Sequence, residues 1–333
     1  MALDAGVRAR LSLPAICAPM FLVTGPALVR EACKAGVIGA LPRPNARSFE
    51  EFEAWLRGVH DDLRAWSDAA EGASFAPMAA NFPAAMEQAE LDAHLALCVK
   101  YGVDIVISVG GDPTRIIAQA HDHGLKVFHD VTSIRFAEKA IRAGADGLNC
   151  IGAGGGGHSG TISHLALIPQ IRAIYDGTLV LAGAVSTGAV IRAAEILGAD
   201  LAYLGTRFIA TREAEAPEGY KQMLIDETSA GLAYTGKVAG VPANWLIASM
   251  RENGLDPENL PEPVGRGIQH GHLPEGVKPW KTLWSAGQGI DLIHDAPSVA
   301  ELVERLRREY IAACATPDMT AAAARANARA GRV

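Results

Sequence analysis

The residues with the clearest capacity for chemistry lie in one glycine-rich stretch, residues 144–160. A short apolar run, Gly147–Ile151, leads into four consecutive glycines at 154–157 and then into His158. Glycine gives up side-chain packing and adds entropy to the unfolded chain, so such a run is expected where the backbone approaches a ligand closely or takes positive φ. Histidine titrates near neutral pH and can remove a proton. The stretch therefore predicts a ligand site with His158 beside the ligand.

Two other motifs match this stretch only in part. Residues 152–157 satisfy the G-x-G-x-x-G dinucleotide fingerprint, in which an acidic residue about 20 positions on ends the next strand. Asp176 falls at about that distance but precedes its strand, which argues against a dinucleotide site. Residues 157–160 are one residue short of the nucleophile elbow G-x-S-x-G, so hydrolase chemistry at Ser159 is not favoured. A purely structural role for His158, ordering the loop or donating to a ligand, stays open.

The remaining histidines and the cysteines do not predict a metal site. His270 and His272 lie in a proline-rich stretch without a carboxylate or cysteine at ligand spacing. His121 and His123 fall at the end of a predicted helix, where positive charge suits the helix dipole. The 5 cysteines are widely spaced with no Cys-x-x-Cys pair, which is typical of reduced thiols.

Composition narrows the function classes. Hydrophobic residues make up 49% of the 333 residues, enough for two domains or one large α/β barrel. The net charge of -7 and the absence of a Lys/Arg run disfavour nucleic acid as a partner. Residues 1–10 lack the apolar core of a signal peptide, and no apolar run approaches the roughly 20 residues that span a bilayer. We therefore expect a cytoplasmic protein without a membrane partner.

Short apolar runs alternate with amphipathic helical patterns through the first two thirds of the chain. The predicted strands are residues 13–20, 37–41, 75–82, 104–109, 126–131, 147–151, 178–185 and 201–204. The predicted helices are residues 27–35, a helix capped by Ser48, and residues 87–100, 113–121, 134–143, 165–175, 189–197 and 217–226. Eight such units predict an α/β fold of the (β/α)8 TIM-barrel type.

The alternation of predicted strands and helices ends after the eighth unit. Residues 229–280 are rich in proline and predict a cap or lid, with long loops and a helix over residues 244–251. A further helix is expected from its cap Ser298 to Tyr310. The predicted division is therefore a barrel of residues 1–228 plus 281–315, the cap segment, and a C-terminal tail of residues 316–333. Part of that tail, residues 321–333, reads as a final helix or a frayed end.

Unusual residues cluster where the predicted strands end, which is where a barrel builds its active site. They are Pro19, Met20, Asn81, Gly110, Gly111, Asp130, the glycine run with His158, residues 183–188, Gly205 and Thr206. Loops after the seventh and eighth strands usually bind phosphate, because free backbone N–H groups attract anions there. Ordinary tight turns are the alternative for these two loops. Trp280, Trp284 and Gln288 are expected to line the pocket from the cap, although core packing explains the tryptophans equally well.

Five ordered motifs resemble the nitronate monooxygenases, formerly called 2-nitropropane dioxygenases. They are residues 14–20, 156–160, 182–188, 197–211 and 284–289. The resemblance implies an FMN-containing TIM barrel in which His158 is the catalytic base. It places the flavin phosphate over Gly183, Gly205 and Thr206, and the isoalloxazine ring near residues 18–20, Asn81 and the glycine run. The full implied FMN set is Ala18, Pro19, Met20, Asn81, Asp130, Gly156, Gly157, Gly183, Ala184, Gly205, Thr206 and Gln288.

The chain departs from the family pattern at five positions. Gly154 and Gly155 stand where members commonly have Glu and Ala, and Cys17 stands where many have Gln. Asp130 replaces a Lys that contacts the flavin, and Ala184 replaces a Gly. Loss of the Glu and the Lys changes the polarity of the pocket, so the substrate need not be a simple alkyl nitronate. Sister groups on this scaffold are FMN-dependent NAD(P)H:quinone reductases and enoyl-thioester reductases.

The favoured hypothesis is an FMN-dependent oxidoreductase that oxidises alkyl nitronates or nitroalkanes with O2. A neutral nitroalkane must lose its α-proton, and His158 would remove it. The alternative is an FMN-dependent NAD(P)H reductase of a quinone or an enoyl thioester, and the third hypothesis is a non-redox phosphate-binding barrel. Expected partners are a small-molecule substrate with O2 or NAD(P)H, and a homodimer is compatible with the sequence.

Overall fold

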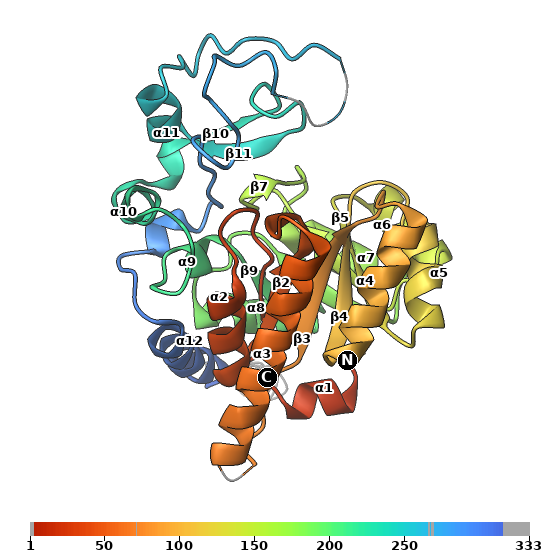
Figure 1. Cartoon of the computed structure of the whole chain (residues 1–333). Helices are drawn as coiled ribbons and strands as arrows, with labels where there is room; N and C mark the ends of the chain where they lie inside the picture. The colour runs from red at the N-terminus through yellow and green to blue at the C-terminus, as the bar shows by residue number, and fades with distance from the viewer. Residues whose placement is uncertain (1–2, 71, 266, 268–269, 316–333) are drawn as a thin grey trace, which may run out of the picture.

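Eight parallel strands close into a barrel in the order in which they follow one another along the chain (Figure 1). The computed structural model describes residues 3–70, 72–265, 267 and 270–315. The barrel strands are β1 (Ala15–Cys17), β2 (Ile38–Pro42), β3 (Met78–Pro83), β4 (Val103–Val109), β5 (Lys126–Val131), β6 (Gly147–Ile151), β8 (Thr178–Ala182) and β9 (Leu201–Leu204). Ile16 of β1 pairs with Ile38 on one side and with Tyr203 on the other, which closes the sheet. The predicted (β/α)8 barrel is confirmed.

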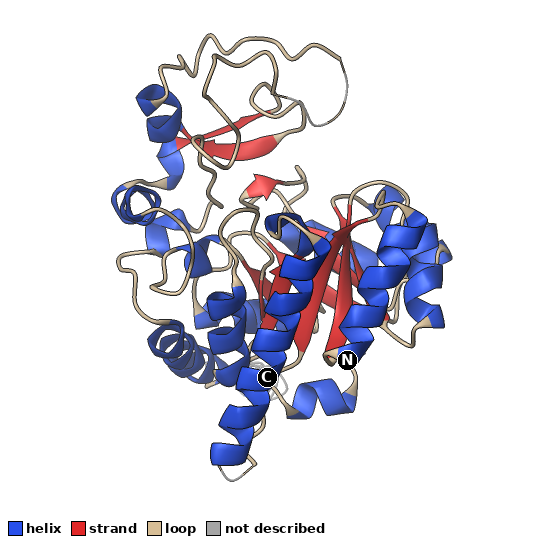
Figure 2. Ribbon diagram, viewed as in Figure 1, coloured by secondary structure: helices blue, strands red, loops and turns tan. Residues whose placement is uncertain are grey.

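Helices cover the outside of this barrel (Figure 2). They are α2 (Pro26–Lys34), α3 (Phe49–Ala69), α4 (Gln88–Lys100), α5 (Thr114–Asp122), α6 (Ile134–Arg142), α7 (His164–Arg172), α8 (Gly188–Leu197), α9 (Thr206–Ile209), α10 (Glu218–Asp226) and α12 (Val299–Cys314). Short 3-10 turns occur at η1 (Arg43–Asn45), η2 (Ser229–Gly231) and η3 (Ile290–Leu292). Two predicted caps are present: the Ser48 hydroxyl accepts from the Glu51 N–H at 3.1 Å, and Ser298 forms a capping box with Glu301. No helix in the described residues is both long and apolar enough to cross a membrane.

The strands are buried on both faces, as a parallel barrel requires. One apolar cluster fills the inside of the barrel, with Ile16, Ile38, Ile107 and Val180 among its members. A larger cluster lies between the strands and the surrounding helices. A short N-terminal helix, α1 (Ala5–Ala9), was not predicted; its Val7 joins the inner cluster, so α1 covers one end of the barrel.

Residues 229–280 lie above the barrel and contain more regular structure than expected (Figure 1). β10 (Leu232–Thr235) and β11 (Ala243–Leu246) pair antiparallel, and β11 pairs with β7 (Gly157–His158) from the glycine run. A separate apolar cluster fills this segment, with Trp245 and Met250 fully buried in it. The strand β10 and the pairing of the glycine run were not predicted.

The helix predicted over residues 244–251 is wrong in its first half. Residues 244–246 belong to β11, and α11 (Ile247–Glu252) begins after them. Apolar residues at short spacing fit a helix face and a buried strand equally well, and here pairing with β10 decides for the strand.

Three predicted strands extend two or more residues beyond an observed end. The strand predicted over residues 75–82 begins only at Met78. The strand predicted over residues 178–185 stops at Ala182, because Gly183 and Ala184 have φ of 120 and 55 degrees, outside the extended region. The strand predicted over residues 13–20 is limited to Ala15–Cys17. The predicted tail, residues 316–333, lies outside the described residues.

Candidate functional site

A cavity of about 760 Å³ lies at the carboxyl ends of the barrel strands. All eight barrel strands, or the loops that follow them, contribute to its lining, and Trp280 and Val241 contribute from residues 229–280. His158 and eleven of the twelve residues of the predicted FMN set line it: Ala18, Pro19, Met20, Asn81, Asp130, Gly156, Gly157, Gly183, Ala184, Gly205 and Thr206. The barrel therefore brings to one space residues that are up to 188 positions apart in the chain.

Gln288 is the exception. Its backbone N–H donates to the Gly154 carbonyl at 3.0 Å, but its side chain is exposed and does not line the cavity. Its neighbours Gly287 and Gly289 line the cavity instead. Of the two tryptophans, Trp280 lines the cavity, whereas Trp284 stacks on Tyr220 with ring centroids 5.0 Å apart.

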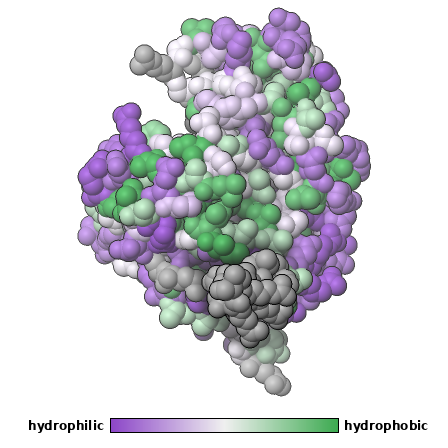
Figure 3. All heavy atoms as spheres, turned by 180° about the vertical axis from the view of Figure 1, so that it is seen from behind, coloured by the Kyte–Doolittle hydropathy of each residue, from purple (hydrophilic) through white to green (hydrophobic). Residues whose placement is uncertain are grey.

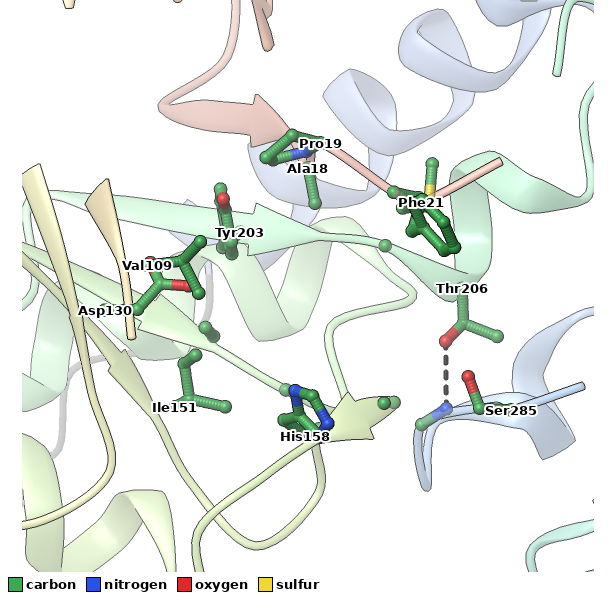
Figure 4. A pocket seen from close by; sticks show the side chains of 18 of the residues that line it. Ala18, Pro19, Phe21, Val109, Asp130, Ile151, His158, Tyr203, Thr206 and Ser285 are labelled. Atoms are coloured by element: carbon green, nitrogen blue, oxygen red, sulfur yellow. Dashed lines mark hydrogen bonds between the residues drawn. The ribbon is translucent and has the colours of Figure 1, made fainter. Parts of the chain in front are cut away.

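His158 reaches the cavity from β7 (Figure 4). Its imidazole packs edge-on against Trp280 with ring centroids 5.0 Å apart. Its Nε2 is buried and has no hydrogen-bond partner among the described residues. Burial lowers the pKa of His158 below the ordinary histidine value, because the charged imidazolium loses its hydration. The ring is therefore neutral at neutral pH, with one nitrogen free to accept a proton.

Asn244 of β11 holds the segment around the glycine run in place through its side-chain amide. Its buried side-chain amide donates to the Gly155 carbonyl at 2.6 Å, to the Ser159 hydroxyl at 3.3 Å and to the Ala153 carbonyl at 3.4 Å. The Tyr234 hydroxyl donates to the Ser159 carbonyl at 3.0 Å. The residues around His158 are thus tied to β10 and β11. Sequence reasoning missed Asn244 because it placed this residue in a helix.

The half-buried Asp130 of β5 and the buried Asn149 of β6 form a polar pair. The Asn149 amide donates to the Asp130 carboxylate at 2.8 Å. Desolvation raises the pKa of Asp130 to about 7, against the opposing effect of that hydrogen bond. The Oδ1 atom of Asn149 is buried with no partner among the described residues. Tyr203 of β9 also lines this part of the cavity; in the sequence it is indistinguishable from a core residue.

The loops after β8 and β9 give the cavity a wall of backbone and small side chains. Gly183, Ala184 and Ser186 contribute from the first loop, and Gly205 and Thr206 from the second. The Thr206 hydroxyl accepts from the Gly287 N–H at 2.9 Å, which ties the second loop to the segment before η3 (Figure 4). Ala184 has the left-handed φ of 55 degrees that a glycine adopts more readily.

The residues present fit the flavin that the family resemblance implies. The volume is ample for an aromatic ring system with a phosphate tail, and the lining is mostly apolar. Gly205 lines the cavity, and a Cβ added there would meet Met20 and Ala18 only at ordinary contact distance, 3.7 Å and beyond. Small residues in the loops after the last two strands are the usual phosphate seat of such barrels. The partnerless Nε2 of His158, which lines the cavity, marks where a bound molecule would complete the hydrogen bonding.

Other chemistry finds less support in the side chains around the cavity. Within the described residues, no group of three or more His, Cys, Asp or Glu side chains could hold a metal ion. Ser159 is buried, and its hydroxyl accepts a hydrogen bond from the Asn244 amide; within the described residues no histidine or carboxylate is hydrogen-bonded to that hydroxyl. Its environment gives no sign of hydrolase chemistry.

Comparison with known proteins gives the same family as the motifs. The family model described as nitronate monooxygenase matches residues 50–309. The chain is 29% identical over 358 aligned positions to the nitronate monooxygenase of Paraburkholderia phytofirmans, across 91% of this chain and 95% of that protein.

Two solved structures share the fold. The nitroalkane oxidase from Streptomyces ansochromogenes superposes with a TM-score of 0.73 at 24% identity, covering 94% of this chain and 100% of that one. FabK from Thermotoga maritima gives a TM-score of 0.69 at 22% identity, covering 93% and 97%. Since the family model spans most of the chain, the protein belongs to the nitronate monooxygenase family and is a flavin-dependent oxidoreductase.

Proposed function

We propose that this protein is an FMN-dependent oxidoreductase that oxidises alkyl nitronates or nitroalkanes with O2. The observation that carries the proposal is the half-buried imidazole of His158 at a mostly apolar cavity, whose buried Nε2 has no partner among the described residues and whose pKa is lowered by desolvation. A base in that state suits the removal of a weakly acidic proton from carbon. One relative in sequence is named a nitronate monooxygenase and one structure of the same fold a nitroalkane oxidase, which agrees with this chemistry.

The residues that would hold FMN follow from the wall of the cavity. Gly183, Gly205 and Thr206 would bind its phosphate through backbone N–H groups and a hydroxyl, whereas the Ala184 N–H already donates to the Gly154 carbonyl at 3.0 Å. Residues 18–20, Asn81 and the glycine run would border its ring. When bound, the flavin supplies the redox chemistry, taking electrons from the substrate and passing them to O2.

The protein's own part is to place the substrate and to move one proton. His158 Nε2 would accept the α-proton of a neutral nitroalkane, and Trp280 would keep the ring oriented and shielded from water. A preformed nitronate has already lost this proton and needs only binding and positioning. We also propose that residues 229–280 form a cap over the barrel formed by residues 1–228 and 281–315, since β11 of this segment holds the His158 loop.

Two measurements test the proposal. The purified protein should show the visible absorption of an oxidised flavin, and extraction should release FMN. His158→Ala should keep the flavin yet lose about 10² to 10⁴-fold in turnover of a neutral nitroalkane, with a much smaller loss on the matching nitronate. His123→Ala is the control, because that histidine pairs with Asp92 at the surface.

Each other outcome points to a different activity. An equal loss on both substrates would mean that His158 is not the base. Rapid anaerobic bleaching by NAD(P)H, with none by a nitronate, would establish the NAD(P)H reductase instead. A colourless protein that takes up no FMN would leave the non-redox phosphate-binding barrel as the remaining hypothesis.

A further inference from the structure

The cavity lining contains no lysine or arginine among the described residues. Its titratable side chains are His129, Asp130, His158, Tyr203 and Tyr220. The two histidines have pKa values lowered by burial, to about 4 for His129. The cavity therefore offers no side-chain cation to a second anionic group on a substrate.

Two cations on the helices that follow β4 and β5 are already engaged. Lys139 pairs with Asp112 at 2.8 Å, and Arg115 donates to the backbone carbonyls of Ala84 and Met86. Neither side chain lines the cavity. Recruiting one of them to a bound ligand would break contacts that it makes in the structure.

The entrance is apolar instead of charged. Phe21 and Phe136 line it while remaining 45% and 50% exposed, and Val109 and Val241 also line the cavity. Seen from behind, the surface is hollowed between the cap and the barrel, and hydrophobic side chains gather on the barrel side of the hollow (Figure 3). Large apolar side chains left in contact with water at the rim of a cavity mark a site that binds apolar groups.

We infer that the substrates of this cavity are uncharged and apolar beyond their nitro or nitronate group, and that a second anionic group is rejected. This inference rests on the proposed function and specifies its substrate class. A carboxylate entering the cavity would lose its hydration without gaining a cationic partner, which is a large penalty. Each methylene buried against the aromatic rim would instead raise affinity by about fourfold.

The test compares two nitronates of the same shape. 3-Methylbutyl-1-nitronate and propionate-3-nitronate differ mainly in the replacement of two methyl groups by two carboxylate oxygens. We expect kcat/KM to be at least about 100-fold higher for the alkyl compound, and to rise along a series of longer n-alkyl nitronates. Equal rates, or a preference for the carboxylated compound, would overturn the inference.

A binding measurement separates this inference from the proposed reaction. The unreactive amides 4-methylpentanamide and succinamate reproduce the two shapes, and their Kd values are read from perturbation of the flavin spectrum. Preferential binding of 4-methylpentanamide, without turnover of either nitronate, would reject the proposed reaction and retain the apolar selectivity. Equal or tighter binding of succinamate would reject the selectivity whatever the turnover.

A cation introduced at the apolar entrance of the cavity provides a variant that tests the same selectivity. Phe136→Arg should reduce the preference for the alkyl nitronate at least about tenfold, because the new cation can pair with a carboxylate. Val99→Arg is the control: Val99 is also 50% exposed and on a helix, but it does not line the cavity. An unchanged preference in Phe136→Arg, or an equal change in Val99→Arg, would count against the rim as the source of selectivity.

Discussion

Ala184 and Gly154 are two departures from the family pattern that meet in space. A Cβ placed on Gly154 would lie 2.7 Å from the Cβ of Ala184, closer than two carbon atoms can approach. Ala184 also has a φ of 55 degrees, which is unfavourable for a residue with a side chain. The absence of a side chain at Gly154 is what makes room for Ala184, so the two positions are expected to vary together.

This coupling can be measured with a double-mutant cycle. Ala184→Gly should stabilise the protein by about 1 kcal/mol, because it relieves the left-handed strain. Gly154→Ala should destabilise by about 1–3 kcal/mol through the clash. The double variant should recover at least about 1 kcal/mol relative to the sum, measured by chemical denaturation. Strict additivity would show that the two side chains do not compete for this space.

Asp130 should make the stability of the flavin-free protein depend on pH. Its pKa is raised to about 7, whereas a carboxyl in the unfolded chain has a pKa of about 3.9. Between about pH 4 and pH 7 the native state therefore keeps a proton that the unfolded state has lost, so stability falls across this range and levels off above about pH 7. Replacing Asp130 by Asn removes this loss.

The expected result is a pH-dependent gain in stability. Asp130→Asn should raise the free energy of unfolding by on the order of 2 kcal/mol more at about pH 8.5 than at about pH 5. This figure is smaller than the full shift in pKa would give, because water in the cavity screens part of the effect. Asp92→Asn, a surface substitution with the same change of charge, is the control. If the two variants show the same pH dependence, Asp130 does not hold its proton in the native state.

At the scale of elements, β11 is the part of the cap that bears most directly on His158. It pairs with β7, and its Asn244 donates three hydrogen bonds into the glycine run. Asn244 touches no part of the cavity, so it acts by positioning the loop that carries the base.

Removing this amide should loosen the loop without removing the base. Asn244→Ala leaves the Gly155 carbonyl buried and unpaired, at a cost of about 1–3 kcal/mol in stability. Turnover of a neutral nitroalkane should fall about 10 to 100-fold, with a smaller loss on the nitronate. Because a looser loop lets water reach the imidazole, the pKa of His158 should rise, and the acid limb of the pH–rate profile should move to higher pH.

The control is a second asparagine of the same segment. Asn253 donates through its side chain to the Ser249 and Thr282 carbonyls, both at 2.8 Å, away from the cavity. Asn253→Ala should lower stability by a similar amount and leave the pH–rate profile in place. A shift of the same size in both variants would mean that general loosening of the cap, and not the clamp on the glycine run, controls His158.

For the whole molecule, the barrel was predictable, and so was the break in its pattern at residues 229–280, whereas the sheet within that segment was not. Each barrel strand is a short run buried on both faces and bounded by turn residues, so pattern alone located all eight strands. The pairing of β7 with β11 joins residues such as His158 and Ala243, which are 85 positions apart (243 − 158), and no local pattern encodes such a pairing. The spacing of apolar residues in β11 and α11 fits a strand and a helix equally well, and only the pairing of β11 with β10 distinguishes the two.

Some residues of the candidate site were likewise predictable from the sequence, and others were not. Glycines, prolines and polar residues at strand ends were recognisable because they break an apolar pattern, and eleven of the twelve predicted cofactor residues line one cavity with His158. Asn244, Tyr203 and Phe136 were missed, because each lies inside an element where its type is unremarkable. The burial and hydrogen bonding that give these three side chains a role exist only in the folded protein.

The assembled cavity makes a prediction about cofactor binding that involves the whole barrel. If the loops after β8 and β9 bind the flavin phosphate, FMN should stabilise the protein more than riboflavin, which has the same ring without the phosphate. At about 100 times its Kd, FMN should raise the free energy of unfolding by about 2.7 kcal/mol. Thermal unfolding of the flavin-free protein with each ligand at equal concentration gives the comparison.

Gly205→Ala shows whether the difference arises at the proposed phosphate seat. Gly205 has a φ of -101 degrees, which alanine also adopts, and the nearest atoms to an added Cβ are those of Met20 and Ala18 at 3.7 Å and beyond. The methyl group should therefore leave the fold intact and intrude only on the ligand, weakening FMN about tenfold and riboflavin less. Gly58→Ala, where nothing lies within 4 Å of the added Cβ, controls for the substitution itself. Equal stabilisation of the unsubstituted protein by FMN and riboflavin would place the phosphate outside these two loops.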